Sequence, residues 1–309
     1  MSGAYRTLAA LHELRERSVR LHEQMSACRL CGRACGANRL AGESGACHTA
    51  RHAVVSSFNA HCGEEAPLSG QHGSGTIFFT WCSLRCEFCQ NHEISQLGEG
   101  KEVTEEDLAV MMLALQRTGC HNINLVTPSH VVPQIVGALE IAAGHGLHVP
   151  LVYNSSGYDS VETLRLLDGI VDIYMPDMKY GDPEVALRLS GVKDYPAVNQ
   201  AAVCEMHRQV GDLQVDQRGI AVRGLLVRHL VLPNGLAGTE QVVRFIAAEI
   251  STDTYLNIMD QYRPCYHAGA HMEIARPITY EEYNDAVDLA LAHGLTRLDS
   301  RGRRFVVVH

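Results

Sequence analysis

Three cysteines in one short loop constrain this chain more than any other feature. Cys82, Cys86 and Cys89 follow one another in the spacing C-x3-C-x2-C, directly after the apolar run 75–80. This spacing supplies three thiolate ligands, which leave one iron of a four-iron cluster without a protein ligand. An outside molecule can coordinate that iron and exchange electrons with it. A structural zinc site is the weaker interpretation, because such sites usually take four ligands in paired C-x2-C form.

A second group of cysteines lies upstream of this loop. Cys28, Cys31, Cys35 and Cys47 fall within twenty residues, with glycines among them that let the backbone turn tightly around the sulfur atoms. We expect these cysteines to bind a metal. The C-x2-C start suits zinc and the C-x3-C continuation suits a second iron–sulfur cluster, so the identity of the metal stays open. Unliganded cysteines in a glycine-rich loop are the alternative.

Charge and hydropathy exclude some classes of function. The chain has 309 residues, of which 46% are hydrophobic, and its formal net charge is −9. A general nucleic-acid binder needs a basic face to neutralise phosphates, and the sequence has none. We expect no membrane segment either, because no apolar stretch reaches the ~18 residues of a spanning helix and the N-terminus lacks the apolar core of a signal peptide. Cysteines clustered in metal-like spacings indicate reduced thiols and a cytoplasmic protein.

Strand-like and helix-like segments alternate along most of the chain, which predicts an α/β fold of parallel strands joined by crossover helices. A charged amphipathic helix over 4–25 and a short strand over 52–58 come first. The strands that follow are expected at 75–80, 122–126, 149–153, 171–175, 225–232 and 254–259. Thr104 is the expected N-cap of the next helix, with Asp107 at its third position. Further helices are expected at 131–144, 159–168, 183–190, 196–209, 239–250 and 280–293.

Polar residues follow these strands at their carboxyl ends, where parallel α/β enzymes place their catalytic side chains. Each segment alone could be an ordinary turn, but together they supply the varied groups that a zwitterionic ligand with a ribose and an adenine requires. The segments are 127–130, 154–158, 176–179, 233–235 and 260–264, together with Arg228 and His229 inside the fifth strand.

Several stretches of the sequence together resemble one known family. They are residues 28–36, 61–70, 78–82, 89–95, 124–130 and 175–179, together with the aromatic Phe88 ahead of the last loop cysteine. The chain resembles the radical S-adenosylmethionine (radical SAM) superfamily, and within it the pyruvate formate-lyase activating enzyme-related proteins that carry an N-terminal cysteine motif. The resemblance implies an open, partial (β/α)6 TIM-like barrel at 67–309, after an N-terminal helix and cysteine-rich metal-binding segment at 1–66. Six strand–helix units are too few for a closed eight-stranded barrel.

The same resemblance implies roles for individual residues. Cys82, Cys86 and Cys89 would hold a [4Fe-4S] cluster that reductively cleaves S-adenosylmethionine (SAM). The implied contacts to SAM come from the backbone of Phe88, from Thr127 and Ser129 near its amino group, from Asn154, Ser155 and Ser156 after the third strand, from Asp177, from Lys179 at its carboxylate, and from Arg228. The sixth strand departs from the family, because Asp260-Gln-Tyr replaces its Pro-Tyr-His, so we expect no histidine contact there.

Three functions follow from these expectations. The first is a radical SAM oxidoreductase that activates a glycyl radical enzyme by abstracting a hydrogen, with an electron donor such as flavodoxin or ferredoxin. The second is radical SAM modification of another peptide or small molecule. The third, from a different class, is a non-catalytic zinc-binding interaction protein. Lys179 also has a plainer interpretation, as the partner of Asp177 or Asp182 in a surface salt bridge.

Overall fold

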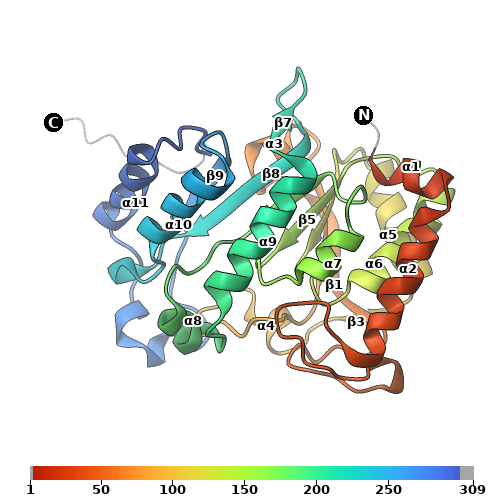
Figure 1. The fold of residues 1–309 in the computed structure, drawn as a ribbon, viewed down its shortest axis with the longest axis horizontal. Helices are drawn as coiled ribbons and strands as arrows, with labels where there is room; N and C mark the ends of the chain where they lie inside the picture. Colours follow the sequence, from red (N-terminus) through yellow and green to blue (C-terminus); the bar gives the residue numbers. More distant parts are fainter. Residues whose placement is uncertain (1–2, 300–309) are drawn as a thin grey trace.

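The computed structural model describes residues 3–299, which form an α/β fold around a mostly parallel sheet (Figure 1). The parallel strands are β2 Ser74–Phe79, β4 Ile123–Val126, β5 Leu151–Ser155, β6 Ile173–Pro176, β8 Ala221–Leu230 and β9 Tyr255–Met259. They pair in chain order, each hydrogen-bonded in parallel to the next. Their carboxyl ends therefore lie along one edge, as expected from the alternating sequence pattern.

Three short antiparallel pairings extend the sheet. Strand β1 Ala53–His61 pairs with β2, β3 Lys101–Val103 pairs with β1, and β7 Gln214–Val215 pairs with β8. The strand expected at 52–58 is β1, which continues to His61. The sequence did not predict β3 or β7. This arrangement puts β1 and β3 at one end of the sheet and β9 toward the other.

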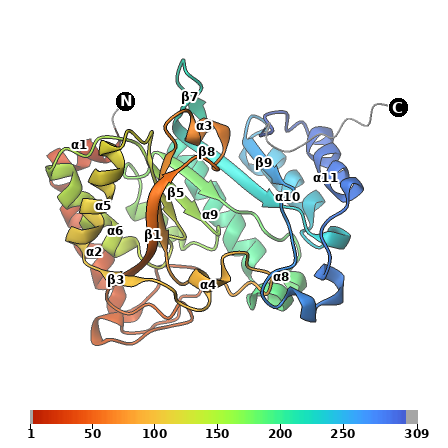
Figure 2. The ribbon, with the colours of Figure 1, turned by 180° about the vertical axis from the view of Figure 1, so that it is seen from behind.

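Helices cover the outer face of the sheet (Figures 1 and 2). They are α1 Tyr5–Ala10, α2 Glu13–Glu23, α5 Glu105–Arg117, α6 Val132–Gly144, α7 Val161–Leu166, α9 Tyr195–Val210, α10 Thr239–Phe245 and α11 Tyr280–Ala292. The helices α3 Ala66–Ser69, α4 His92–Ser95 and α8 Pro183–Ser190 lie elsewhere, α3 on the opposite face and α4 and α8 near the cysteine loop. A π-helical turn, Ile246–Ile250, continues α10. The single helix expected over 4–25 is wrong. His12 adopts a left-handed conformation, with φ of 61°, and separates α1 from α2.

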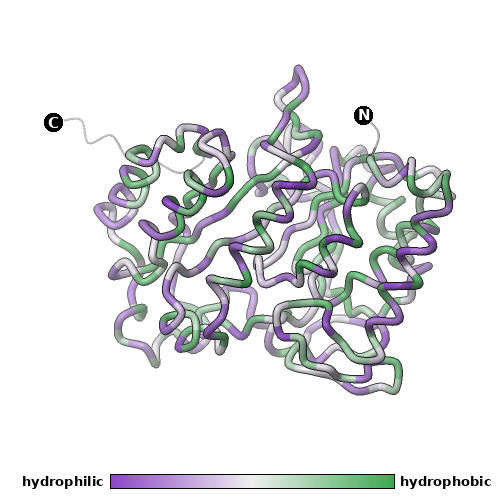
Figure 3. Tube along the Cα trace, in the orientation of Figure 1, coloured by the Kyte–Doolittle hydropathy of each residue, from purple (hydrophilic) through white to green (hydrophobic). Residues whose placement is uncertain are grey.

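Alternation along the strands separates two of the three buried apolar clusters. Leu125, Tyr153 and Tyr174 face the helices and belong to the main apolar cluster, whereas Val152 and Ile173 belong to a smaller cluster with Leu68 and Leu226. Successive strand residues point to opposite faces of a sheet, so the residues two positions after Val152 and Leu226 share their face. Those residues are Asn154 and Arg228. Apolar and polar stretches also alternate along α2 and α11 in Figure 3, as expected for helices with one face on the core.

Within residues 3–299, no helix has the length and apolarity needed to cross a membrane. The division of the chain at residue 66 stays a prediction. Residues on both sides of it contribute to the main core, since Tyr5, Leu14 and Leu21 pack in the same cluster as residues of α6.

The expected N-cap of α5 is present. The Thr104 hydroxyl accepts a hydrogen bond from the Asp107 backbone N–H at 3.1 Å, and the Asp107 carboxylate accepts one from the Thr104 N–H at 3.0 Å. Replacing Thr104 with alanine removes this capping box and should lower the free energy of unfolding by about 1 kcal/mol. Urea denaturation measures the difference. Thr104→Ser keeps the hydroxyl and should restore most of the loss, and equal loss in both variants would contradict a role for the cap.

Candidate functional site

The three loop cysteines lie at the carboxyl end of β2 and line one cavity of about 150 Å³. Each sulfur has a hydrogen-bonding group beside it. The Ser190 hydroxyl donates to Cys86 at 3.0 Å, the Leu84 N–H donates to Cys82 at 3.4 Å, and Ser95 Oγ lies 3.1 Å from the Cys89 sulfur. Donors of this kind stabilise thiolate ligands, so the surroundings of the loop suit metal coordination.

Seven of the polar residues expected from the strand ends line the same cavity. Those that do are Thr127, Asn154, Ser155, Ser156, Asp177, Lys179 and Arg228. They come from four different strand ends and are brought to the cysteines by the parallel order of the strands. The geometry therefore places seven of the nine expected SAM-contacting residues against the candidate cluster loop, although their individual roles stay predictions.

Phe88 and Ser129 are the two that do not line the cavity. The Phe88 ring packs edge-on against Tyr180 and Tyr262, with ring centroids 6.4 and 5.7 Å apart, and is 4% exposed. Ser129 is also buried. A contact through the Phe88 backbone stays a prediction, but neither side chain forms part of the cavity lining.

An ion-pair network lies at the centre of the site. Asp177 accepts hydrogen bonds from Lys179 Nζ at 2.6 Å and from Arg228 Nε at 2.9 Å, and Arg228 Nη2 also donates to Asn154 Oδ1 at 2.8 Å. The alternative pairing of Lys179 with Asp177 is thus present. It is not a surface pair, because the two side chains are only 18% and 12% exposed.

Charge pairing decides the ionisation of this network. Burial alone would raise the pKa of Asp177, but Arg228 and Lys179 outweigh it and hold that pKa below its ordinary value. Burial alone would lower the pKa of Lys179, but Asp177, followed by Cys86, raises it above its ordinary value. Both groups are therefore charged at neutral pH, and the cavity contains a fixed ammonium group.

Two residues beside the cavity have left-handed backbone conformations. Trp81 has φ of 70° and lies two residues after the end of β2, and Thr127 has φ of 63° and directly follows β4. This conformation is strained for a β-branched residue such as Thr127. The Thr127 N–H donates to the Asn154 carbonyl at 2.9 Å. Such strain is concentrated at functional sites, which supports this edge of the sheet as the site.

The loop cysteines fit a cluster better than they fit free thiols. Burial, followed by the neighbouring Cys86, raises the pKa of Cys82 to about 12. Charge repulsion from Cys86 and Cys89 also raises this pKa, so a bound cation would favour the thiolate form of all three. Three soft donors in a buried cavity match iron–sulfur ligation. In the described part of the chain, no group of His, Cys, Asp or Glu converges on a single metal ion.

The upstream cysteines lie in a separate segment between α2 and β1. Cys28, Cys31 and Cys47 are buried and Cys35 is exposed. Their electrostatic interactions indicate that they lie near one another. Cys35 raises the pKa of Cys28, and Cys47 and Cys28 raise the pKa of Cys31. Burial is the main cause that raises the pKa values of Cys28 and Cys31. A metal at these cysteines stays a prediction.

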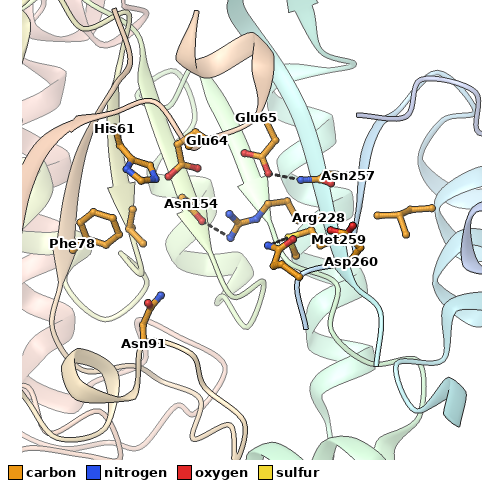
Figure 4. Close-up of a pocket in the computed structure, with 14 residues that line it drawn as sticks. His61, Glu64, Glu65, Phe78, Asn91, Asn154, Arg228, Asn257, Met259 and Asp260 are labelled. Carbon is orange, nitrogen blue, oxygen red and sulfur yellow. Dashed lines mark hydrogen bonds between the residues drawn. The ribbon is translucent and has the colours of Figure 1, made fainter. Parts of the chain in front are cut away.

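A larger chamber of about 460 Å³ adjoins the cysteine cavity and shares Asn91, Val126, Asn154 and Arg228 with it (Figure 4). Its other walls include Glu64 and Glu65 from the segment after β1, and Asn257 from β9. Sequence reasoning assigned no role to these three residues. A signal existed for Asn257, an amide inside an otherwise apolar strand. For the glutamates the signal was their place in segment 61–70, one of the stretches that resemble the family.

Comparisons with known proteins agree with this geometry. Residues 76–211 match the family model of the radical SAM superfamily, a range that contains the three loop cysteines and the strand ends as far as Lys179. The chain is also 33% identical over 275 residues to a protein of Methanocaldococcus jannaschii named "Uncharacterized protein MJ0674". The alignment covers 87% of this chain and 75% of that protein.

Proposed function

This chain belongs to the radical SAM superfamily, and from that premise we propose that it is an activating enzyme that abstracts a hydrogen from a glycine of a partner enzyme. Membership of this superfamily implies an enzyme of SAM-dependent radical chemistry. One observation carries the assignment of the site. Three cysteines and seven polar strand-end residues, distant in sequence, line one cavity.

Cys82, Cys86 and Cys89 would hold a [4Fe-4S] cluster. When bound, that cluster supplies the electron that cleaves SAM and releases a 5′-deoxyadenosyl radical, which abstracts hydrogen from the substrate. Lys179 would bind the SAM carboxylate, since its ammonium is fixed in the cavity by Asp177. Arg228 holds Asn154 and Asp177 in place through its two hydrogen bonds. Asn154 and Ser156 offer polar groups for hydroxyls, and Ser156 Oγ has no partner among residues 3–299.

The sequence resemblance supports the proposed barrel, electron donor and compartment. We interpret the six parallel strands as an open, partial (β/α)6 barrel, whose lateral gap would admit a protein loop. A flavodoxin or ferredoxin would supply electrons, and the reducing cytoplasm would be the compartment. The second candidate is radical modification of another peptide or small molecule, which the 460 Å³ chamber favours, since its volume suits a compact ligand. A non-catalytic zinc protein is not supported, because the chain belongs to a family of enzymes.

Anaerobic reconstitution tests this proposal. Reduced holoprotein should cleave SAM to methionine and 5′-deoxyadenosine, measured by chromatography. Incubation with a glycyl radical enzyme encoded beside this chain should then give a glycyl radical in electron paramagnetic resonance spectra. SAM cleavage without a glycyl radical would favour the second candidate, and no cleavage would overturn both.

A separate prediction concerns the upstream cysteines. Replacing the buried Cys31 with alanine should reduce the metal bound per chain and lower the melting temperature, because a structural site adds its binding free energy to folding. Some SAM cleavage should remain. Elemental analysis and thermal unfolding measure these effects, and Cys204→Ala, at an exposed cysteine of α9, is the matched control. Unchanged metal content in Cys31→Ala would show that the four cysteines are not a site.

A further inference from the structure

The 460 Å³ chamber beside the cysteine cavity has an acidic wall. Glu64 and Glu65, from the segment that joins β1 to α3, face it from one side, and Asp260, directly after β9, faces it from another. Figure 4 shows the carboxylates of Glu64 and Glu65 turned inward, above Asn154 and Arg228. The chamber thus lies over the part of the site assigned to SAM, where a substrate must bind to meet the radical.

One carboxylate oxygen of Glu65 accepts no hydrogen bond from residues 3–299. Glu65 is 5% exposed, and its Oε1 accepts a hydrogen bond from Asn257 Nδ2 at 2.8 Å. Its Oε2 is buried without a hydrogen-bond partner anywhere in the described chain. Leaving a charged acceptor unsatisfied is unfavourable, so a ligand that donates to this oxygen gains an interaction that is not already made.

The contact between Glu65 and Asn257 also has a structural effect, because it connects the two ends of the sheet. Glu65 follows β1 and Asn257 lies in β9, 192 residues later. A purely structural contact, however, needs only the one accepted hydrogen bond, which a neutral glutamine would make equally well. The structural role therefore does not account for the negative charge of Glu65.

The balance of charge around the chamber favours a cationic ligand. The cations Lys179 and Arg228 share Asp177, and Arg228 also interacts electrostatically with Glu65 and Glu64. Among the residues that line the chamber, the carboxylates of Glu64, Glu65 and Asp260 outnumber the guanidinium of Arg228. An anionic substrate would have to use Arg228, whose guanidinium already donates to Asp177 and Asn154. It would also approach Glu65, which repels it.

We propose that this chamber binds a substrate through a positively charged group, an aliphatic ammonium or a guanidinium, with Glu65 Oε2 as its acceptor. This inference rests on the proposed radical SAM function and specifies the substrate class of that site. The cation belongs either to a small amine or to a lysine or arginine side chain of a peptide. The chemistry recognised is the same in both cases.

Binding to the SAM-loaded holoprotein tests the proposal without turnover. The probes are 1,5-diaminopentane, with 1,5-pentanediol as its uncharged match, and the capped tripeptide Gly-Lys-Gly, with Gly-norleucine-Gly as its match. Calorimetric titration should detect at least one charged probe and neither neutral one. The probe that binds more tightly identifies the source, a free amine or a peptide side chain. Equal binding of charged and neutral probes would overturn the proposal, and this comparison needs no variant.

Glu65→Gln is the matched variant, because glutamine keeps the acceptor for Asn257 and removes only the charge. The charged probe should bind about tenfold more weakly, because an amide NH2 group, which cannot accept a hydrogen bond, would replace the carboxylate oxygen that accepts from the ammonium. Glu106→Gln, at an exposed position of α5, should bind it as the wild type does. Wild-type affinity of Glu65→Gln for the probe would refute the assignment. A loss of SAM affinity in this variant would do so too, because it would assign Glu65 to the cofactor.

These outcomes are separable from failure of the proposed function. If the wild-type protein bound the charged probe but did not cleave SAM, the result would support the cation site and refute the radical SAM activity. If it cleaved SAM but bound neither charged probe, the reverse would hold.

Discussion

Replacing Cys86 with alanine is expected to reduce SAM cleavage to the background of the uncatalysed reaction. Cys86 is 8% exposed, lines the cavity with Cys82 and Cys89, and accepts a hydrogen bond from Ser190. Two remaining thiolates cannot hold a four-iron cluster with its open iron correctly placed. Cys82→Ala and Cys89→Ala should give the same result, because the three ligands act as one unit.

The measurement is 5′-deoxyadenosine formed per chain after anaerobic reconstitution and reduction, together with the iron and sulfide content. Cys204→Ala, at an exposed cysteine remote in sequence from the loop, is the control and should keep wild-type activity. Cleavage at the wild-type rate in any one of the three loop variants would disprove the assignment of the cluster.

Lys179→Met should weaken SAM binding about tenfold to a hundredfold. Methionine keeps much of the side-chain volume and removes the ammonium that would pair with the SAM carboxylate. Charge-assisted hydrogen bonds contribute about 1.5–3 kcal/mol, and each 1.4 kcal/mol corresponds to about a factor of ten in affinity. The substitution does not leave Asp177 unpaired, because Arg228 still donates to it at 2.9 Å. The loss should therefore appear in SAM affinity more than in stability.

Anaerobic titration with SAM measures the affinity, and the absorption of the cluster should persist because no iron ligand changes. Lys193→Met is the matched control, since Lys193 is exposed and pairs with Glu184 at the surface. The raised pKa of Lys179 keeps its ammonium charged throughout the neutral range, so its contribution should not vary between about pH 6 and 9. Wild-type SAM affinity in Lys179→Met would reduce Lys179 to a structural partner of Asp177.

The parts of the fold and of the site that the sequence predicts are those that depend on local pattern. Thr104 caps α5 because a threonine precedes an acidic first turn, and this can be read directly from the residues. Asn154 and Lys179 come together because parallel strands place their carboxyl ends at one edge, so locating the strands also locates these residues.

Features that depend on distant contacts were not predictable in this way. The helix break at His12 is not marked by a glycine or proline in the sequence. The ring of Phe88 turns away from the cavity toward Tyr180 and Tyr262, a choice made by packing across the fold. Glu65 reaches Asn257 only because β1 runs antiparallel to β2, and no periodicity in the sequence specifies that direction.

The hydrogen bonds around Arg39 bear on whether this chemistry could be transplanted. Arg39 is fully buried and donates to the His130 carbonyl at 2.7 Å, while the His130 ring contacts the Thr80 carbonyl, two residues before Cys82. Arg228 and Glu65 likewise lie outside the 76–211 family match. A fragment trimmed to that match would lose Arg39 from the support of the cysteine loop and Arg228 from Asp177. The site therefore depends on residues outside the 76–211 segment, and transferring it to another scaffold would require nearly the whole chain.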